Sequence, residues 1–166
     1  MQKLVFILFA AIVATGCQSL ENAIGPSVDD ERFADAMRYI PAGEEIQVAP
    51  WAIHYPDVAV ATGWTALTLD GLSTYDTSYE GRLALTASLL IHLDYDSALR
   101  VFLPRYQTDL TDVQRVVVKD QDWAGSTIWV FVSDGIQSFH VMSPEDDGFL
   151  SKLAEQEIEV IRPDLN

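Results

Sequence analysis

The sequence predicts a mainly β domain of the α+β class, a small antiparallel barrel or sandwich with one helix before it and one after it. Short apolar runs separated by turn-forming residues fill the middle of the chain, as many short strands would require. Alternating apolar residues, as at Leu89, Ile91 and Leu93, indicate strands. On either side of this region the apolar residues recur at the three- and four-residue spacing of helices.

The first helix is predicted over Val28–Tyr39, with Ser27 in the capping position and Pro41 ending the helix. Its apolar face is formed by Phe33, Met37 and Ile40. The second helix is predicted over Ser143–Glu157, where Ser143 caps and Pro144 takes the first helical position. Its apolar stripe, expected to point into the core, consists of Phe149, Leu150 and Leu153. A final extended segment is expected at Glu157–Arg162.

The strands lie between the two helices, and a polar loop over Asp70–Gly81 interrupts them. The predicted strands are Glu45–Ile53, Val58–Thr62, Trp64–Leu69, Arg82–Thr86, Leu89–Asp94, Leu99–Leu103, Asp112–Lys119, Thr127–Ser133 and Ile136–Met142. Pro50 interrupts the first of them, and Pro104 ends the strand that begins at Leu99. Asp134-Gly135 indicates a two-residue hairpin turn between the last two strands.

The first residues have the pattern expected of a secretory leader. Lys3 supplies one positive charge, and the apolar run Leu4–Val13 is too short for a transmembrane helix, which needs about 20 residues. Residues 14–17, Ala-Thr-Gly-Cys, resemble the lipobox of bacterial lipoproteins. An ordinary cleaved signal with an incidental cysteine is the alternative. We expect a signal peptide at 1–16, a lipidated tether at 17–27 and one globular domain at 28–166.

The resemblance to lipoproteins implies that the leader is cut before Cys17, which then carries lipid on its sulfur and its amine. Acyl chains of this kind hold a protein on a membrane, since each buried methylene contributes about 0.8 kcal/mol. Gln18 follows the cysteine, where Asp would favour retention at the inner membrane. The resemblance therefore implies a lipid-anchored protein of the outer membrane that faces the periplasm.

Charge and cysteine content exclude several functions. The formal net charge is −15, which disfavours nucleic acid and anionic phospholipid head groups as partners. Cys17 is the single cysteine, so no thiol nucleophile, disulfide or cysteine-bound metal is expected in the lipidated protein. No nucleotide loop, nucleophile elbow or zinc-protease motif occurs in the sequence. We therefore predict no catalytic residue, no metal and no cofactor.

Several segments resemble the GRAM and bacterial branch of the pleckstrin-homology superfold, in which antiparallel strands are closed by a C-terminal helix. They are Gly43–Ile46, Gly81–Thr86 with Leu89–Leu93, Leu110–Val118, and Phe139–Met142 with the helix after it. The resemblance covers about 42–157 and implies this fold, with Pro56–Glu80 as an insertion; another small barrel is the alternative. Many such domains bind inositol lipids through basic residues, but no Lys or Arg occurs between Arg38 and Arg82, so we expect no such binding here.

Acidic residues give weak candidates for a site. His92, Asp94 and Asp96 alternate along a predicted strand and so share a face, as metal ligands or an acid–base set would. A solvated strand face is the simpler interpretation, because acidic residues are frequent in this chain. Asp120 with Asp122, and the run Glu145–Asp147, are interpreted in the same way as a turn and a helix start.

Aromatic residues give the other candidate. The candidate interaction surface consists of Trp51, Tyr55, Trp64, Tyr75 and Tyr79. Large amphipathic rings are favoured at interfaces, although tryptophan is usually buried, and Trp129 is expected in the core.

The sequence thus favours a membrane-tethered, non-catalytic binding or scaffold lipoprotein of the cell envelope, with an envelope protein as its partner. One alternative is a carrier or sensor that holds a lipid or acyl chain in a barrel cavity. The other is a hydrolase whose site the common motifs miss.

Overall fold

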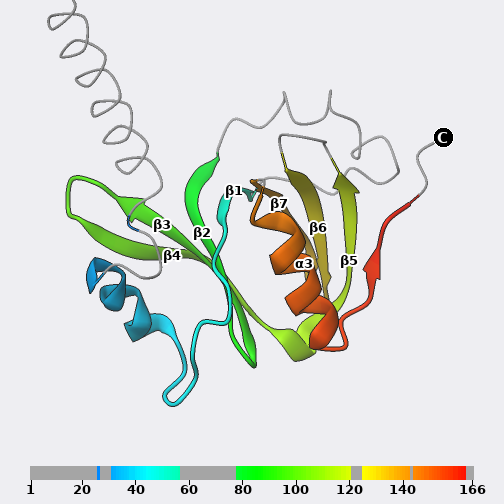
Figure 1. Cartoon of the computed structure of the whole chain (residues 1–166), viewed down its shortest axis with the longest axis horizontal. Helices are drawn as coiled ribbons and strands as arrows, with labels where there is room; N and C mark the ends of the chain where they lie inside the picture. The colour runs from blue at the N-terminus through cyan, green and yellow to red at the C-terminus, as the bar shows by residue number, and fades with distance from the viewer. Residues whose placement is uncertain (1–25, 27–30, 57–77, 121–124, 143, 164–166) are drawn as a thin grey trace, which may run out of the picture.

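The fold is known from a computed structural model that describes residues 26, 31–56, 78–120, 125–142 and 144–163. Within these residues it is built around one sheet of eight strands (Figure 1). The strands are β1 (Trp51–Tyr55), β2 (Tyr79–Leu85), β3 (Leu89–Asp96), β4 (Val101–Asp109), β5 (Val113–Asp120), β6 (Ser126–Val132), β7 (Gly135–Val141) and β8 (Val160–Ile161). The helices are the 3₁₀ helices η1 (Glu31–Tyr39) and η3 (Leu110–Asp112) and the α-helix α3 (Asp146–Glu155). No helix among the described residues has the length and apolar character needed to cross a membrane.

The strand order identifies the fold. It runs β4-β3-β2-β1-β7-β6-β5-β8, with every pair antiparallel except β5 and the short β8. Because β1 pairs with both β2 and β7, it joins the hairpins of β2–β4 to those of β5–β7. This order, followed by a C-terminal helix, is the plan of the pleckstrin-homology superfold. The predicted mainly β fold is therefore confirmed, as an open sheet.

The main core lies between the inner face of the sheet and α3. Phe149, Leu150 and Leu153 of α3 are all buried there, which confirms the predicted apolar stripe. They pack in one cluster with Leu83, Leu85, Leu90, Ile128, Val130, Phe139 and Val141, among others. Figure 1 shows α3 lying along the sheet beside β6 and β7. The helix begins at Asp146 after Glu145, so Pro144 precedes it, and Ser143 lies outside the described residues.

A second core covers the outer face of β2, β3 and β4. There η1 places Phe33, Ala36 and Ile40 against a sheet surface that includes Leu89, Ile91, Leu93 and Phe102. Met37 was predicted on this face but is 39% exposed, while Ala36 is fully buried. The reason is that η1 is a 3₁₀ helix. With three residues per turn, positions 33, 36 and 39 lie on one face, whereas position 37 turns away from it. With cores on both sides, residues 89–93 of β3 are buried without a break.

The two prolines act differently. Pro50 does interrupt the predicted first strand: β1 begins after it, although Gln47 and Val48 still exchange backbone hydrogen bonds with Leu85, with N–O distances of 2.8 and 2.9 Å. Pro104 does not end its strand as predicted, because β4 continues to Asp109. A proline is tolerated where the strand is the last of its sheet and needs no outward N–H donor.

Other boundaries shift by smaller amounts. Val132 pairs with Gly135, so the β6–β7 turn consists of Ser133 and Asp134 instead of Asp134-Gly135. β2 begins at Tyr79, inside the predicted polar loop. Of the remaining predicted elements, the strands Val58–Thr62 and Trp64–Leu69, the capping residue Ser27 and residues 28–30 of the first helix lie outside the described residues.

Glu44 ties the segment before β1 to the β2–β3 turn. Its carboxylate accepts hydrogen bonds from the hydroxyls of Ser88 (2.6 Å) and Thr86 (2.5 Å), and from the backbone N–H of Ser88 (3.2 Å). These bonds, led by the Ser88 hydroxyl, lower the pKa of Glu44 because they stabilise its charged form. Part of the Gly43–Ile46 segment that resembles the superfold thus fixes a neighbouring hairpin.

Candidate binding site

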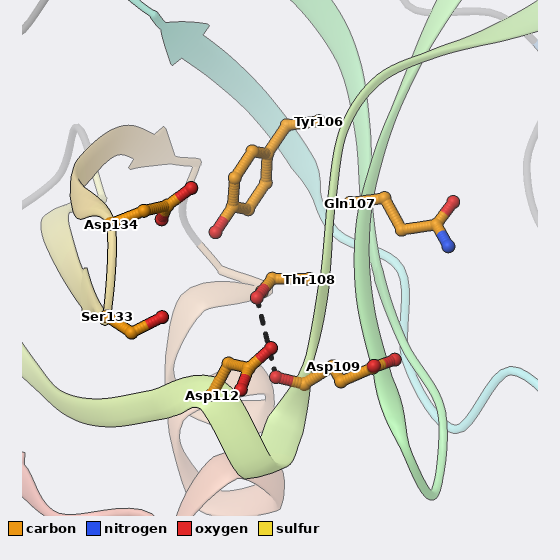
Figure 2. Close-up of a pocket in the computed structure, with 7 residues that line it drawn as sticks. All are labelled: Tyr106, Gln107, Thr108, Asp109, Asp112, Ser133 and Asp134. Atoms are coloured by element: carbon orange, nitrogen blue, oxygen red, sulfur yellow. Dashed lines mark hydrogen bonds between the residues drawn. The ribbon is translucent and has the colours of Figure 1, made fainter.

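A polar hollow opens where β4, η3 and the β6–β7 turn meet (Figure 2). Its volume is about 290 Å³. It is lined by Tyr106, Gln107, Thr108, Asp109, Asp112, Ser133 and Asp134. The continuation of β4 beyond Pro104 brings the first four of these residues to the hollow.

Figure 2 shows how these side chains lie. The carboxylates of Asp112 and Asp134 border the space from opposite sides, and the phenol of Tyr106 points between them. Gln107 and Asp109 point away from the space. The Thr108 hydroxyl donates to the backbone oxygen of Asp109 at 3.4 Å. The hollow is therefore bordered by two carboxylates together with the hydroxyls of Tyr106, Thr108 and Ser133.

Tyr106 keeps its proton in this setting. Burial raises the pKa of its phenol, and the nearby negative charges of Asp134 and Asp112 act in the same direction. The hydroxyl oxygen is buried, and its interaction with the neighbouring Thr108 side chain lowers the pKa without offsetting the effect of burial. The lining residues include carboxylates and hydroxyls but no Lys or Arg, so the hollow suits a cationic group that donates hydrogen bonds.

The sequence patterns predicted none of these lining residues. They come from two segments, 106–112 and 133–134, that only the folded sheet brings together. The available signal was the acidic content of both segments, but acids are frequent throughout the chain. The pairing of the strands would have been needed to place Asp112 opposite Asp134.

Behind Tyr106 the inner face of the sheet holds two buried histidines. His54 of β1 is 2% exposed and His92 of β3 is fully buried, and their ring centres lie 5.3 Å apart. His54 stacks on Phe139 at 4.7 Å and lies 5.6 Å from the ring of Tyr106. Burial, followed by repulsion from His54, lowers the pKa of His92 to about 3, and burial also lowers the pKa of His54.

The predicted set of His92, Asp94 and Asp96 does not form one site. Asp94 makes an ion pair with Arg105 at 2.7 Å, and Asp96 accepts hydrogen bonds from the backbone of Ala98 and Leu99 in the β3–β4 turn. The interpretation as a solvated face is wrong for His92, because that face of β3 turns into the core. Among the described residues no group of three or more His, Cys, Asp or Glu is arranged to hold a metal ion.

The other acidic candidates attach α3 to the sheet. Glu145 accepts a hydrogen bond from the backbone N–H of Trp51 at 2.9 Å and lies 3.5 Å from the buried guanidinium of Arg82. The Ser126 hydroxyl lies within hydrogen-bond distance of the carboxylates of Asp146 (2.8 Å) and Asp120 (3.1 Å), and its one hydrogen can be donated to either. Asp122 lies outside the described residues.

The structure describes three of the five residues in the predicted aromatic surface, and they do not all lie on one face of the sheet. Trp51 and Tyr55 stand at alternate positions of β1 and so share its outer face, where both are partly buried. Tyr79 pairs with His54, which places it on the opposite face, and the guanidinium of Arg105 lies over its ring at 4.6 Å. Trp64, Tyr75 and Cys17 lie outside the described residues. Trp129 is buried, as predicted.

No family model matches the sequence, and no curated protein matches it either. Similar solved structures include N-terminally truncated linker-DH/PH domains of p115-RhoGEF, with 12% identity, a TM-score of 0.47, and coverage of 77% of this chain and 34% of that chain. Another is the hSac2 domain from the human phosphoinositide phosphatase Sac2, with 12% identity, a TM-score of 0.45, and coverage of 85% of this chain and 93% of that chain.

A mutant of the DH/PH domains of p115-RhoGEF is similar at 10% identity with a TM-score of 0.45, over 78% of this chain and 35% of that chain. This chain therefore spans about a third of the length of the p115-RhoGEF chains. At this level of likeness the fold assignment rests on the strand order and the closing helix.

Proposed function

We propose that this chain is a non-catalytic binding domain of the bacterial cell envelope, and that it binds a basic segment of an envelope protein at the acidic hollow. The observation that carries the proposal is the convergence of Asp112 and Asp134 on one open space with hydroxyl groups between them. A lysine or arginine side chain would find both opposite charge and hydrogen-bond acceptors there.

The charge of the whole chain favours the same partner. A formal net charge of −15 attracts basic surfaces over a distance and speeds their encounter with this domain. The alternative of a lipid or acyl carrier would need an apolar cavity. The hollow is polar, and large apolar side chains such as Phe139, Leu83 and Leu90 occupy the inner face of the sheet.

A capped tri-lysine peptide tests the proposal on the full chain in detergent. We expect weak binding that saturates as peptide is added, seen as shifts of the backbone amide resonances of Thr108, Asp112 and Ser133. Neutralising one carboxylate, by Asp112→Asn or Asp134→Asn, should weaken binding about threefold, the effect of losing one exposed charge pair. Added salt should weaken it further, because exposed charges are screened.

Asp109→Asn is the matched control. It removes the same charge from the same segment, but its side chain points away from the hollow, so binding should stay as in the unmodified protein. An uncharged tri-norleucine peptide should not bind. Equal losses from Asp109→Asn and Asp112→Asn would contradict a defined site, because the attraction would then come from the overall charge.

We further propose that a lipidated Cys17 anchors the domain to the outer membrane on its periplasmic side. The support is the leader and the Ala-Thr-Gly-Cys sequence that ends it. The mature protein should fractionate with membranes, and Cys17→Ser should prevent lipidation. Mass spectrometry of the mature N-terminus decides the point: an unmodified amine on another residue would reject the anchor.

A further inference from the structure

Two of the three histidines of the chain lie side by side on the inner face of the sheet. His54 of β1 is 2% exposed and His92 of β3 is fully buried, and their ring centres are 5.3 Å apart. The ring of Phe139 lies 4.7 Å from that of His54 and 6.1 Å from that of His92. The pair is therefore packed among aromatic rings, which cannot replace the water that a charged imidazole would lose.

Each of the two rings has a hydrogen-bond partner for only one of its nitrogens. His92 Nε2 lies 3.3 Å from the backbone oxygen of Ala52, and His54 Nε2 lies 3.0 Å from the side-chain oxygen of Gln137. Nδ1 is buried without a partner in both residues. A neutral ring tolerates this arrangement, because only one of its nitrogens carries a proton. A protonated ring donates from both nitrogens, so its Nδ1–H would be a buried donor without an acceptor.

The described residues of β4 and β2 that face the rings do not compensate a positive charge. From β4, the phenol of Tyr106 lies 5.6 Å from His54, and the positive charge of Arg105 opposes a proton on His92. From β2, the ring of Tyr79 lies 6.4 Å from His54. A proton on either histidine therefore meets neutral phenols and a second cation.

The nearby carboxylates interact with other groups. Asp94, two residues along β3 from His92, forms an ion pair with Arg105 at 2.7 Å. Asp112 and Asp134 border the hollow, where their charges act on Tyr106. β7 contributes uncharged side chains, and α3 packs on this face through apolar residues. Within the described part of the chain, no carboxylate stabilises a proton on either histidine.

We propose that His54 and His92 form an acid-sensitive switch, in which a proton on either ring opens the inner face of the sheet to solvent. The second proton costs more than the first, because like charges 5.3 Å apart repel each other. Tyr106 packs against His54 and also lines the hollow, so opening this face disturbs the hollow as well. In mild acid the domain loosens at the histidine pair before its carboxylates are protonated.

The stability of the domain is expected to fall as the pH decreases from 6.5 to about 3. Burial and repulsion from His54 hold the pKa of folded His92 at about 3, whereas its ordinary value is 6.5. The unfolded chain therefore takes up a proton first, and the full stability is present only above about pH 6.5. Between pH 7.5 and 5.0, His92 alone should raise the equilibrium constant of unfolding about thirtyfold. Burial also lowers the pKa of His54, which adds to the change.

Urea unfolding followed by circular dichroism tests the switch on the full chain in detergent, at pH 7.5 and 5.0 and one ionic strength. We expect the equilibrium constant of unfolding to rise at least about thirtyfold, because carboxylates with ordinary pKa values near 4 stay mostly ionised at pH 5.0. His92→Gln should reduce this ratio about thirtyfold, whatever its effect on stability at pH 7.5. His54→Gln should reduce the ratio as well.

His140→Gln is the matched control. His140 is only partly buried, and its Nδ1 lies 3.2 Å from the hydroxyl of Thr127, so this variant should keep the pH dependence of the unmodified protein. Nitrogen-15 spectra of the rings add a measurement that needs no variant: His92 should remain neutral in the folded protein at pH 5.0. A change of less than about threefold between the two pH values, or a protonated His92 in the folded protein at pH 5.0, would overturn the proposal.

Discussion

Replacing Gly81 with Ala is expected to destabilise the domain by at least about 3 kcal/mol, above the usual cost of an overpacked core position. A Cβ atom on Gly81 would lie 2.0 Å from the backbone oxygen of Leu93, 2.8 Å from its carbonyl carbon and 2.9 Å from the Cα of Asp94. These are backbone atoms of the paired strand β3, so they cannot turn aside as a side chain could. Relief would require part of the β2–β3 pairing to separate.

Urea unfolding followed by circular dichroism measures the loss, and Gly148→Ala is its control. Gly148 lies in α3 with open space where a Cβ would stand, so alanine there should raise the free energy of unfolding by roughly 0.5–1 kcal/mol. The same chemical change should thus act in opposite directions at the two sites. A Gly81→Ala protein as stable as the unmodified one would mean that β2 and β3 do not approach in this register.

The strands that the sequence predicts well are those with turn residues at both ends. β3, β5, β6 and β7 follow the predicted segments within two residues at each end, because alternation or continuous apolar character marks each of them. The predicted strand at 99–103 stops too early, at Pro104, whereas β4 continues beyond it. A proline is excluded from the central strands of a sheet but is tolerated in a strand at its edge. Which strands lie at an end depends on the pairing order, and local sequence does not contain it.

The candidate sites could not be predicted from local sequence for the same reason. Asp112 and Asp134 meet only because η3 and the β6–β7 turn lie at the same end of the folded sheet. His54 and His92 meet because both β1 and β3 flank β2, with Tyr79 and Leu83 of β2 as their respective partners. A signal was present for His92, which occupies the inner position of a strand that is otherwise apolar. The error was to assume that the second face of that strand is solvated.

Replacing Leu153 with Ala is the second large effect that we expect. Leu153 is fully buried where α3 packs on the inner face of the sheet, in one cluster with Leu83, Ile128 and Phe149. Truncation removes buried methyl groups and leaves a cavity, because the strands beneath are fixed by their pairing. The expected loss is about 2–5 kcal/mol in the free energy of unfolding, measured by urea titration.

Leu99→Ala is the matched control, because it makes the same substitution in the β3–β4 turn, where Leu99 is 67% exposed. There the unfolding free energy should change by no more than about 0.5 kcal/mol, as for surface sites generally. The difference between the two variants isolates the burial of one leucine side chain under α3. If both variants unfold at the same urea concentration as the unmodified protein, α3 does not close the core, and the packing of the C-terminal helix on this sheet is wrong.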